Sequence, residues 1–319
     1  MKIAAVGAGR MGRGIALAFA YAGHEVALVD LKVRNDWPTL RDEAMAEMRA
    51  SLAMLAELGA VPGEAIERVM RRIRAYPQSE ANVLGQAEVV FEAVPETLEA
   101  KRAAFARICE LAAPDAVLAS TTSTILVTEL TPLVTRPERL LNAHWLNPAY
   151  LIPLVELSTH PGTSKPVVEK VRRLLEEAGK VPVVCGPTPG YIVPRLQALI
   201  MNEAARMVEE GAASPEDIDK ATRYGLGLRF AAIGVIEFID YGGNDILYYA
   251  SQYLARTISA ERYTPPQSVQ ALMREGHLGL KSGVGFYDYR SRDVRAYRKD
   301  VLERTLRELR QSGLFRPPR

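Results

Sequence analysis

Short apolar runs alternate with stretches of helical periodicity through the first 185 residues of the chain. The predicted strands are KIAAVG from Lys2, EVALVD from Glu25, AEVVFEAV from Ala87, AVLAS from Ala116, LLNAHW from Leu140, PLVELS from Pro153 and VPVVCG from Val181. The predicted helices between them cover residues 10–22, 36–58, 63–74, 98–112 and 164–178. Strands that alternate with helices are typical of a mainly parallel sheet covered by helices on both faces. We therefore expect a doubly wound α/β domain.

The pattern changes at CGPTPG, residues 185 to 190, where two prolines and two glycines fall within six positions. After it, apolar residues recur at helical spacing from Tyr191 to Glu210, and Ser214 and Pro215 have the residue types of an N-cap and first helical position. We predict a domain at 1–186 and an all-α C-terminal domain at 187–319. The segment FAAIGVIEFIDYGGNDILYYASQYL is apolar on most faces. It is a buried central helix pair or a subunit interface, and we favour both together, with a homodimer through this domain.

The amino-acid composition limits the classes of molecule that the protein is expected to bind. The chain has 319 residues and 40 basic against 38 acidic side chains, a net charge of +2, so nothing favours nucleic acid or an anionic membrane. The first residues lack the pattern of a leader, and no later run reaches about 18 apolar residues. Only two cysteines are present, without metal spacing, so no structural zinc is expected. These features favour a cytoplasmic protein that acts on a small molecule. The last residues, from Tyr289 on, form a basic tail that is expected to be a solvated helix.

The turn GAGRMG, residues 7 to 12, has the G-x-G-x-x-G spacing and stands between the first strand and the first helix. In a Rossmann-type domain the glycines permit a tight turn, close approach of a pyrophosphate and close helix packing. The alternative is a turn that only helps strand and helix to pack. We expect NAD here, with contacts from Gly7, Gly9, Arg10, Met11 and Gly12. Asp30 ends the second strand, where a carboxylate accepts bonds from both ribose hydroxyls and repels the 2′-phosphate of NADP.

Polar residues follow three further strands, at the sheet edge where ligands bind in such folds. Glu96 and Lys101 follow the strand from Ala87, and Ser120 to Thr124 follow the next, where helix capping is an equal explanation. His144 lies at the tip of the next apolar run. A lone histidine is more often a core residue than a catalyst. However, Glu156, in the following run, would be costly to bury without a partner.

Pairing His144 with Glu156 explains both residues, because a glutamate that holds one imidazole nitrogen orients the ring and stabilises its protonated form. Such a pair is a general base. Beside a nicotinamide, its substrate carries a hydroxyl on a carbon that also bears hydrogen, and the product is a ketone. The sequence therefore predicts an NAD-dependent alcohol oxidation.

From Ile3 to about Tyr289 the chain resembles the L-3-hydroxyacyl-CoA dehydrogenase family, through HWLNP with a glutamate twelve residues on and through LKSGVGFYDY. The resemblance implies that Ser123, twenty-one residues before His144, holds the substrate oxygen, and that Asn147 helps to seat the nicotinamide. It also implies cofactor contacts for Glu96, Lys101 and Lys281. The implied activity is oxidation of a 3-hydroxyacyl-CoA, such as 3-hydroxybutyryl-CoA, to its 3-keto product.

Two departures from the family pattern leave the acyl carrier open. Pro194 stands where the CoA enzymes usually have asparagine, and the helix after the second strand has Arg41 and Arg49 as its only basic residues, where those enzymes tend to have several lysines. NPAYLIPLVELSTHPGT resembles the L-gulonate 3-dehydrogenase and lambda-crystallin branch. A free hydroxy acid, carnitine or a pyridine-carboxylate alcohol is the alternative substrate.

Two other protein classes compete with this interpretation. The 3-hydroxyisobutyrate dehydrogenase type needs a lysine after the linker, and residues 190 to 211 contain none. A non-catalytic, crystallin-like NAD binder would not need the trio Ser123, His144 and Glu156.

Overall fold

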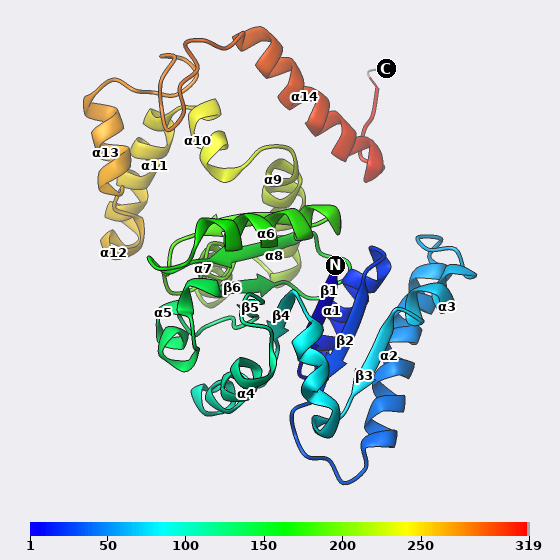
Figure 1. Ribbon diagram of the computed structural model, residues 1–319. Coiled ribbons are helices and arrows are strands. Elements are labelled where there is room, and N and C mark those ends of the chain that lie inside the picture. Colours follow the sequence, from blue (N-terminus) through cyan, green and yellow to red (C-terminus); the bar gives the residue numbers. More distant parts are fainter. Residues whose placement is uncertain (318–319) are drawn as a thin grey trace. The chain divides into compact units, whose positions relative to one another are not determined.

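The computed structural model describes residues 1–317 and divides into two compact units, Met1–Ile200 and Met201–Arg319. Figure 1 shows the strands and their flanking helices in the first unit and helices alone in the second. This arrangement confirms the expected fold class, an α/β domain followed by a helical one. The assignment of separate functions to 1–186 and 187–319 stays a prediction.

The first unit is built on one eight-stranded sheet in the order β3-β2-β1-β4-β5-β6-β7-β8. Its strands are β1 (Lys2–Val6), β2 (Glu25–Val29), β3 (Ile73–Tyr76), β4 (Val89–Glu92), β5 (Val117–Ser120), β6 (Leu140–Trp145), β7 (Leu154–Ser158) and β8 (Val181–Cys185). All neighbouring pairs are parallel except β6 with β7. The strand order reverses between β1 and β4, which is where ligands bind in open α/β sheets.

Helices cover both faces of this sheet and divide its core into two apolar clusters. One cluster lies under α1 (Arg10–Tyr21), α2 (Trp37–Glu57), α3 (Ala65–Met70) and α6 (Lys165–Glu177). The other lies under α4 (Leu98–Leu111), α5 (Val127–Leu130) and the 3₁₀ segment η1 (Gln78–Gln86). Short 3₁₀ segments η2 (Thr131–Leu133) and η3 (Pro137–Arg139) precede β6. The central strands β4, β5 and β6 are therefore buried on both sides, as their continuous apolar sequences predict, whereas the edge strands β3 and β8 are partly exposed.

The C-terminal end of one expected helix was wrong, and a strand was found there instead. The helix expected over 63–74 ends at Met70, and β3 follows at Ile73–Tyr76. Arginine, alanine and methionine favour a helix, but residues 73–76 pair in parallel with residues 26–29 of β2. Pairing at the sheet edge, a contact between distant segments, overrides the local preference here.

The second unit is helical. It contains the end of α7 (Val193–Glu209) and then α8 (Pro215–Ala221), the π-helical η4 (Thr222–Gly227), α9 (Leu228–Ala232), α10 (Val235–Gly242), α11 (Asn244–Thr257), α12 (Ala260–Tyr263), α13 (Gln267–Arg274) and α14 (Val294–Gln311). As expected, Ser214 caps α8 by accepting from the Asp217 N–H at 3.1 Å. The basic tail forms α14, whose Val301 is buried.

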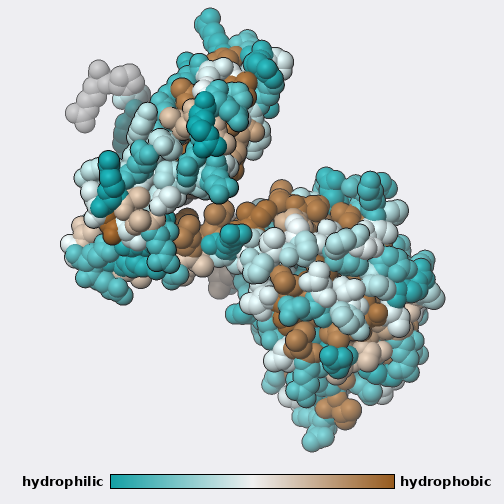
Figure 2. All heavy atoms as spheres, turned by 90° about the vertical axis from the view of Figure 1, so that its left-hand side faces the viewer, coloured by the Kyte–Doolittle hydropathy of each residue, from teal (hydrophilic) through white to brown (hydrophobic). Residues whose placement is uncertain are grey.

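Large apolar side chains reach the surface of this unit. The most exposed on α11 are Ile246, Tyr249 and Tyr253, at 64%, 61% and 59%. Figure 2 shows further hydrophobic residues, in brown, on the surface of the face that it draws. Across residues 1–317, none of the helices combines the length and apolar character that crossing a membrane requires.

Candidate active site

The glycine turn after β1 leaves open space above a tightly packed backbone. Gly7 has φ of 109°, and a Cβ there would lie 2.6 Å from the Ala93 carbonyl oxygen. A Cβ on Gly12 would lie 1.9 Å from the Gly7 oxygen, so α1 packs directly on the turn. A Cβ on Gly9, in contrast, would meet nothing within 4 Å. Tight packing below and free space above fit a pyrophosphate at the start of α1.

Asp30, at the end of β2, is buried but keeps part of its hydrogen-bonding capacity. One carboxylate oxygen accepts the Lys32 N–H at 3.0 Å, and the other accepts Arg34 Nε at 2.8 Å. A carboxylate has about four acceptor positions, so two remain for the hydroxyls of a ribose. The residues present therefore fit NAD, and the guanidinium of Arg34 lies beside Asp30 as a nearby cation.

A cleft of about 610 Å³ connects the glycine turn with His144. It is lined by Gly7, Ala8, Gly9, Arg10, Met11, Asp30, Leu31, Lys32, Arg34, Ala93, Val94, Pro95, Glu96, Thr121, Ser123, His144, Trp145, Leu146 and Asn147. Most residues predicted from the sequence to bind cofactor or substrate thus lie along one cleft. Gly12, Glu156, Lys101 and Lys281 are not in its lining.

His144 and Glu156 face each other across the one antiparallel pair of the sheet. Their positions are register partners on β6 and β7, which accounts for the spacing of twelve residues between them. His144 Nδ1 lies 2.8 Å from Glu156 Oε2, and both side chains are buried. The other carboxylate oxygen accepts the N–H groups of Ile192 and Val193, each at 2.9 Å. The buried charge is therefore fully bonded, and Nε2 is the imidazole nitrogen left for the cleft.

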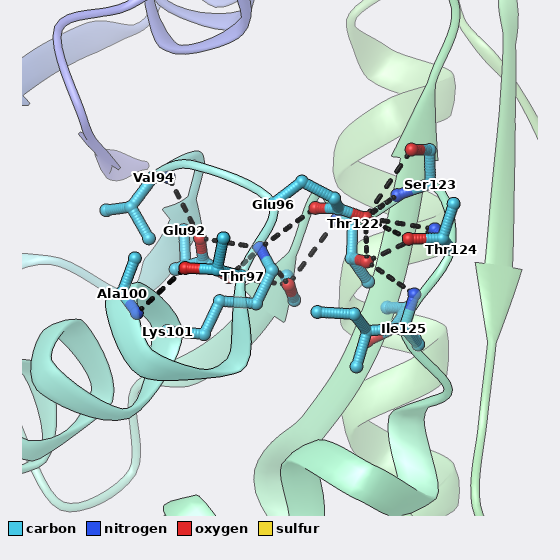
Figure 3. Close-up of polar contacts among 12 residues, drawn as sticks. Glu92, Val94, Glu96, Thr97, Ala100, Lys101, Thr122, Ser123, Thr124 and Ile125 are labelled. Carbon is cyan, nitrogen blue, oxygen red and sulfur yellow. Dashed lines mark hydrogen bonds and ion pairs between the residues drawn. The ribbon is translucent and has the colours of Figure 1, made fainter.

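The loop after β5 is held by Glu96. Its Oε1 accepts the N–H groups of Ser123 at 2.8 Å and Thr124 at 3.0 Å, and the hydroxyl of Thr122 as well (Figure 3). Although partial burial raises the pKa of Glu96, the Thr122 hydrogen bond, the charge of Lys101 and the Thr124 bonds lower it to about 2. Ser123 Oγ is 3.4 Å from the same oxygen, a weak contact that leaves the hydroxyl able to bind elsewhere.

Beneath this loop lies a buried ion pair that the sequence interpretation missed. Lys101 Nζ donates to both oxygens of Glu92 at 3.0 Å, and Glu92 also accepts the Val94 N–H (Figure 3). The hydroxyl of Ser120 donates to the same carboxylate. Lys101 Nζ is also 3.4 Å from Glu96. The signal was available, because Glu92 is a charged residue in the apolar run VVFEAV, as Glu156 is in its own run. The side chain of Lys101 is only 1% exposed. Its predicted contact with the cofactor stays a prediction.

The remaining two predicted residues lie in different surroundings. Asn147 is exposed in the loop after β6 and lines the cleft. Lys281 is in the second unit, where it pairs with Asp245. Its cofactor contact stays a prediction.

Comparisons with known proteins identify the family. Residues 2–188 match the model for the 3-hydroxyacyl-CoA dehydrogenase NAD binding domain, and residues 190–289 match the model for the C-terminal domain of the same family. The chain belongs to the 3-hydroxyacyl-CoA dehydrogenase family. The resemblance seen in the sequence is thereby confirmed, and so are NAD as the cofactor and the class of oxidoreductase.

Relatives within this family differ in their named substrates. The chain is 36% identical over 290 residues to the Escherichia coli 3-hydroxyadipyl-CoA dehydrogenase, covering 91% of this chain and 59% of that protein. A crystal structure of a 3-hydroxyacyl-CoA dehydrogenase from Archaeoglobus fulgidus has a TM-score of 0.78 and 34% identity, covering 99% of this chain and 100% of that one. A Mesorhizobium japonicum 5-formyl-3-hydroxy-2-methylpyridine 4-carboxylate 5-dehydrogenase is 29% identical over 92% of this chain and 93% of its own length. The names of these relatives therefore include one substrate that is not a CoA thioester.

Proposed function

We propose that the chain oxidises the hydroxyl group of a 3-hydroxyacyl substrate to the 3-keto product and that His144 is the general base. The observation that supports this most directly is the 2.8 Å contact between His144 Nδ1 and Glu156 in a cleft that also contains the glycine turn. An imidazole held through Nδ1 presents Nε2 to the substrate, where it can accept a proton.

The chain's residues account for the proton movement. His144 Nε2 takes the hydroxyl proton of the substrate as the C=O bond forms, and Glu156 stabilises the resulting imidazolium. The N–H groups of Ile192 and Val193 hold the carboxylate of Glu156 in place. NAD, when bound, supplies the acceptor for the hydride that leaves the carbinol carbon. A positioned base of this kind contributes about 10²- to 10⁴-fold to the rate.

Ser123 and Asn147 complete the proposed site. Ser123 has a hydroxyl free to donate to the substrate oxygen, because its backbone rather than its side chain makes the strong bond to Glu96. Asn147, three residues after His144, lines the same cleft, where its amide can contact the nicotinamide. NAD is proposed to contact Gly7, Gly9, Arg10, Met11, Gly12, Asp30, Glu96 and Asn147, with Lys101 and Lys281 as further candidates.

A free hydroxy acid or alcohol is the second candidate substrate, and the charges on α2 favour it. Both arginines of this helix are paired with acids: Arg41 lies 2.8 Å from Asp42, and Arg49 lies 2.8 Å from Glu67. Paired guanidinium groups offer less to the phosphates of a CoA carrier than free lysines would. Pro194, in the first turn of α7, has neither a side-chain amide nor an N–H to offer a substrate carbonyl.

The experiment that separates the candidates is an NAD reduction screen with 3-hydroxybutyryl-CoA, free 3-hydroxybutyrate, L-gulonate and carnitine at matched concentrations. The proposal expects turnover of the CoA thioester, with Glu156→Gln as the inactive control. Turnover of free acids alone would exclude a CoA thioester as the substrate, and the same oxidation would then act on a free hydroxy acid. No NADH from any hydroxy substrate would favour a binder without turnover.

We also propose a homodimer through the second unit, in the cytoplasm. The exposed Ile246, Tyr249 and Tyr253 on α11 make an apolar surface suited to a second copy of the chain. Both cysteines are free, as in a reducing compartment. A monomeric mass in analytical ultracentrifugation at micromolar concentration would refute the dimer.

A further inference from the structure

Tyr191, which the sequence interpretation did not single out, connects the two groups that the proposed reaction needs. It lies two residues before the start of α7 and has a φ of 45°, in the left-handed region that residues with a side chain seldom adopt, and it is 6% exposed. A strained and buried residue at this position calls for an explanation from its contacts.

The ring of Tyr191 stacks on the imidazole of His144. The ring centroids are 4.7 Å apart and the planes differ by 17°. Glu156 holds the same imidazole in its plane through Nδ1. The edge contact fixes which nitrogen faces the cleft, and the stacking contact restricts rotation of the ring about its bond to the backbone. Together, the two contacts orient His144 Nε2 toward the cleft.

The hydroxyl of Tyr191 holds the loop that carries Ser123. It donates to the Thr122 carbonyl at 2.7 Å and accepts from Asn142 Nδ2 at 3.1 Å. Burial raises the pKa of the Tyr191 phenol, so this group remains a donor at neutral pH. Glu96 holds the same loop through the Ser123 N–H. Both polar groups of the Thr122–Ser123 peptide, the Thr122 carbonyl and the Ser123 N–H, are therefore held by hydrogen bonds.

We propose that Tyr191 is a positioning residue that sets the placement of His144 relative to Ser123, with separate tasks for its two parts. The ring restrains the base, and the hydroxyl restrains the loop that holds the substrate oxygen. This inference rests on the proposed function of His144. Reaction rates depend on such placement, because a displacement of about 1 Å at a reacting group can cost about 10²-fold.

The test uses two variants that separate the ring from the hydroxyl. Tyr191→Phe keeps the stacking surface and removes the bond to the Thr122 carbonyl, whereas Tyr191→Leu removes both. Tyr297→Phe is the matched control, because it removes a hydroxyl that donates to Glu237 at 2.9 Å in the second unit. For each variant, kcat, KM, the Kd for NADH and the melting temperature are measured with the best substrate of the screen.

We expect Tyr191→Phe to retain kcat within about twofold and to raise KM about three- to tenfold, as expected for one lost hydrogen bond. Tyr191→Leu should in addition lower kcat about 10- to 100-fold. Both should bind NADH within about twofold of the parent, since the glycine turn is a separate element. A fall in kcat for Tyr191→Leu that is larger than its losses in melting temperature and NADH affinity explain is a result that the ring contact predicts and that simple core filling does not.

Two results would overturn the inference. In one, both Tyr191 variants match Tyr297→Phe in kcat and KM. In the other, both lose NADH binding together with turnover, which would indicate a general scaffold role. Failure of the proposed function is distinguished by His144→Gln: normal turnover in that variant rejects the base itself, whereas an inactive His144→Gln with a fully active Tyr191→Leu rejects only the inference on Tyr191.

Discussion

Two buried carboxylates in the first unit, Glu156 and Glu92, have similar burial but different surroundings. Each is wholly enclosed and paired with a nitrogen base within 3.0 Å, Glu156 with His144 and Glu92 with Lys101. The base beside Glu156 keeps one nitrogen for the cleft. The base beside Glu92 is 1% exposed and is surrounded by Glu92, Glu96 and Ser120. The first pair can exchange a proton with a ligand, and the second cannot.

The comparison teaches that burial of an ion pair does not by itself indicate catalysis. A buried ion pair can take part in a reaction when one of its partners has a titratable atom that faces a cleft, as His144 does. When all donors are satisfied inside the protein, the pair holds backbone in place, as Lys101 does beneath the loop of Ser123. Removing the charge should therefore affect turnover in the first pair and folding in the second.

The largest expected effect is on turnover in Glu156→Gln. The amide keeps acceptor capacity for the Ile192 and Val193 N–H groups but cannot stabilise the imidazolium. We expect kcat/KM to fall about 10²- to 10⁴-fold, with NADH affinity unchanged. Steady-state assays and fluorescence titration with NADH check this. Retention of more than a tenth of the parent activity would speak against a role for Glu156 in catalysis.

The corresponding change in the second pair is Lys101→Met, and we expect its main effect on folding. It leaves the carboxylate of Glu92 buried without its cation, so the free energy of unfolding should fall by about 3–5 kcal/mol. Arg49→Met, which breaks an exposed pair with Glu67, is the control and should cost about 1 kcal/mol or less. Urea denaturation measures both. Equal stabilities of the two variants would contradict the structural role of Lys101.

Asp30 lies between these extremes, since it is paired with Arg34 but also lines the cleft. Asp30→Asn removes the charge that repels a 2′-phosphate and frees the guanidinium of Arg34 to meet one. We expect the preference for NAD over NADP, as a ratio of kcat/KM values, to fall about tenfold or more. In the double variant Asp30→Asn/Arg34→Ala, kcat/KM with NADP should fall back from the higher value of the single variant. An unchanged ratio in the single variant would exclude this role of the pair.

The smallest expected effect is the contribution of Glu96 to the stability of the protein at acidic pH. Its folded-state pKa of about 2 lies below the ordinary value of 4.5, so its contribution to stability is present above pH 4.5 and is lost as the pH falls toward 2. The melting temperature of the parent should therefore fall more steeply than that of Glu96→Gln over this range. Parallel curves for the two proteins would show that the Glu96 contacts do not favour the charged form.

The sequence predicted most of the α/β unit because its signals are local. Apolar runs gave seven of the strands, and the glycine spacing located the cofactor turn. His144 and Glu156 were found through the cost of burying a charge. The same argument was not applied to Glu92, which was missed. β3 and Tyr191 could not be predicted in this way, because pairing with β2 and stacking on His144 join segments distant in sequence. The paired state of Arg49 likewise depends on Glu67, eighteen residues away.

The central claim is that His144 removes the substrate proton. Its most direct test is single-turnover NADH formation by the parent and by His144→Gln, with enzyme in excess and the best hydroxy substrate of the screen. The account predicts that the rate falls by about 10²-fold or more while NADH binds with unchanged affinity. A burst of NADH at the parent rate in the His144→Gln protein would contradict it.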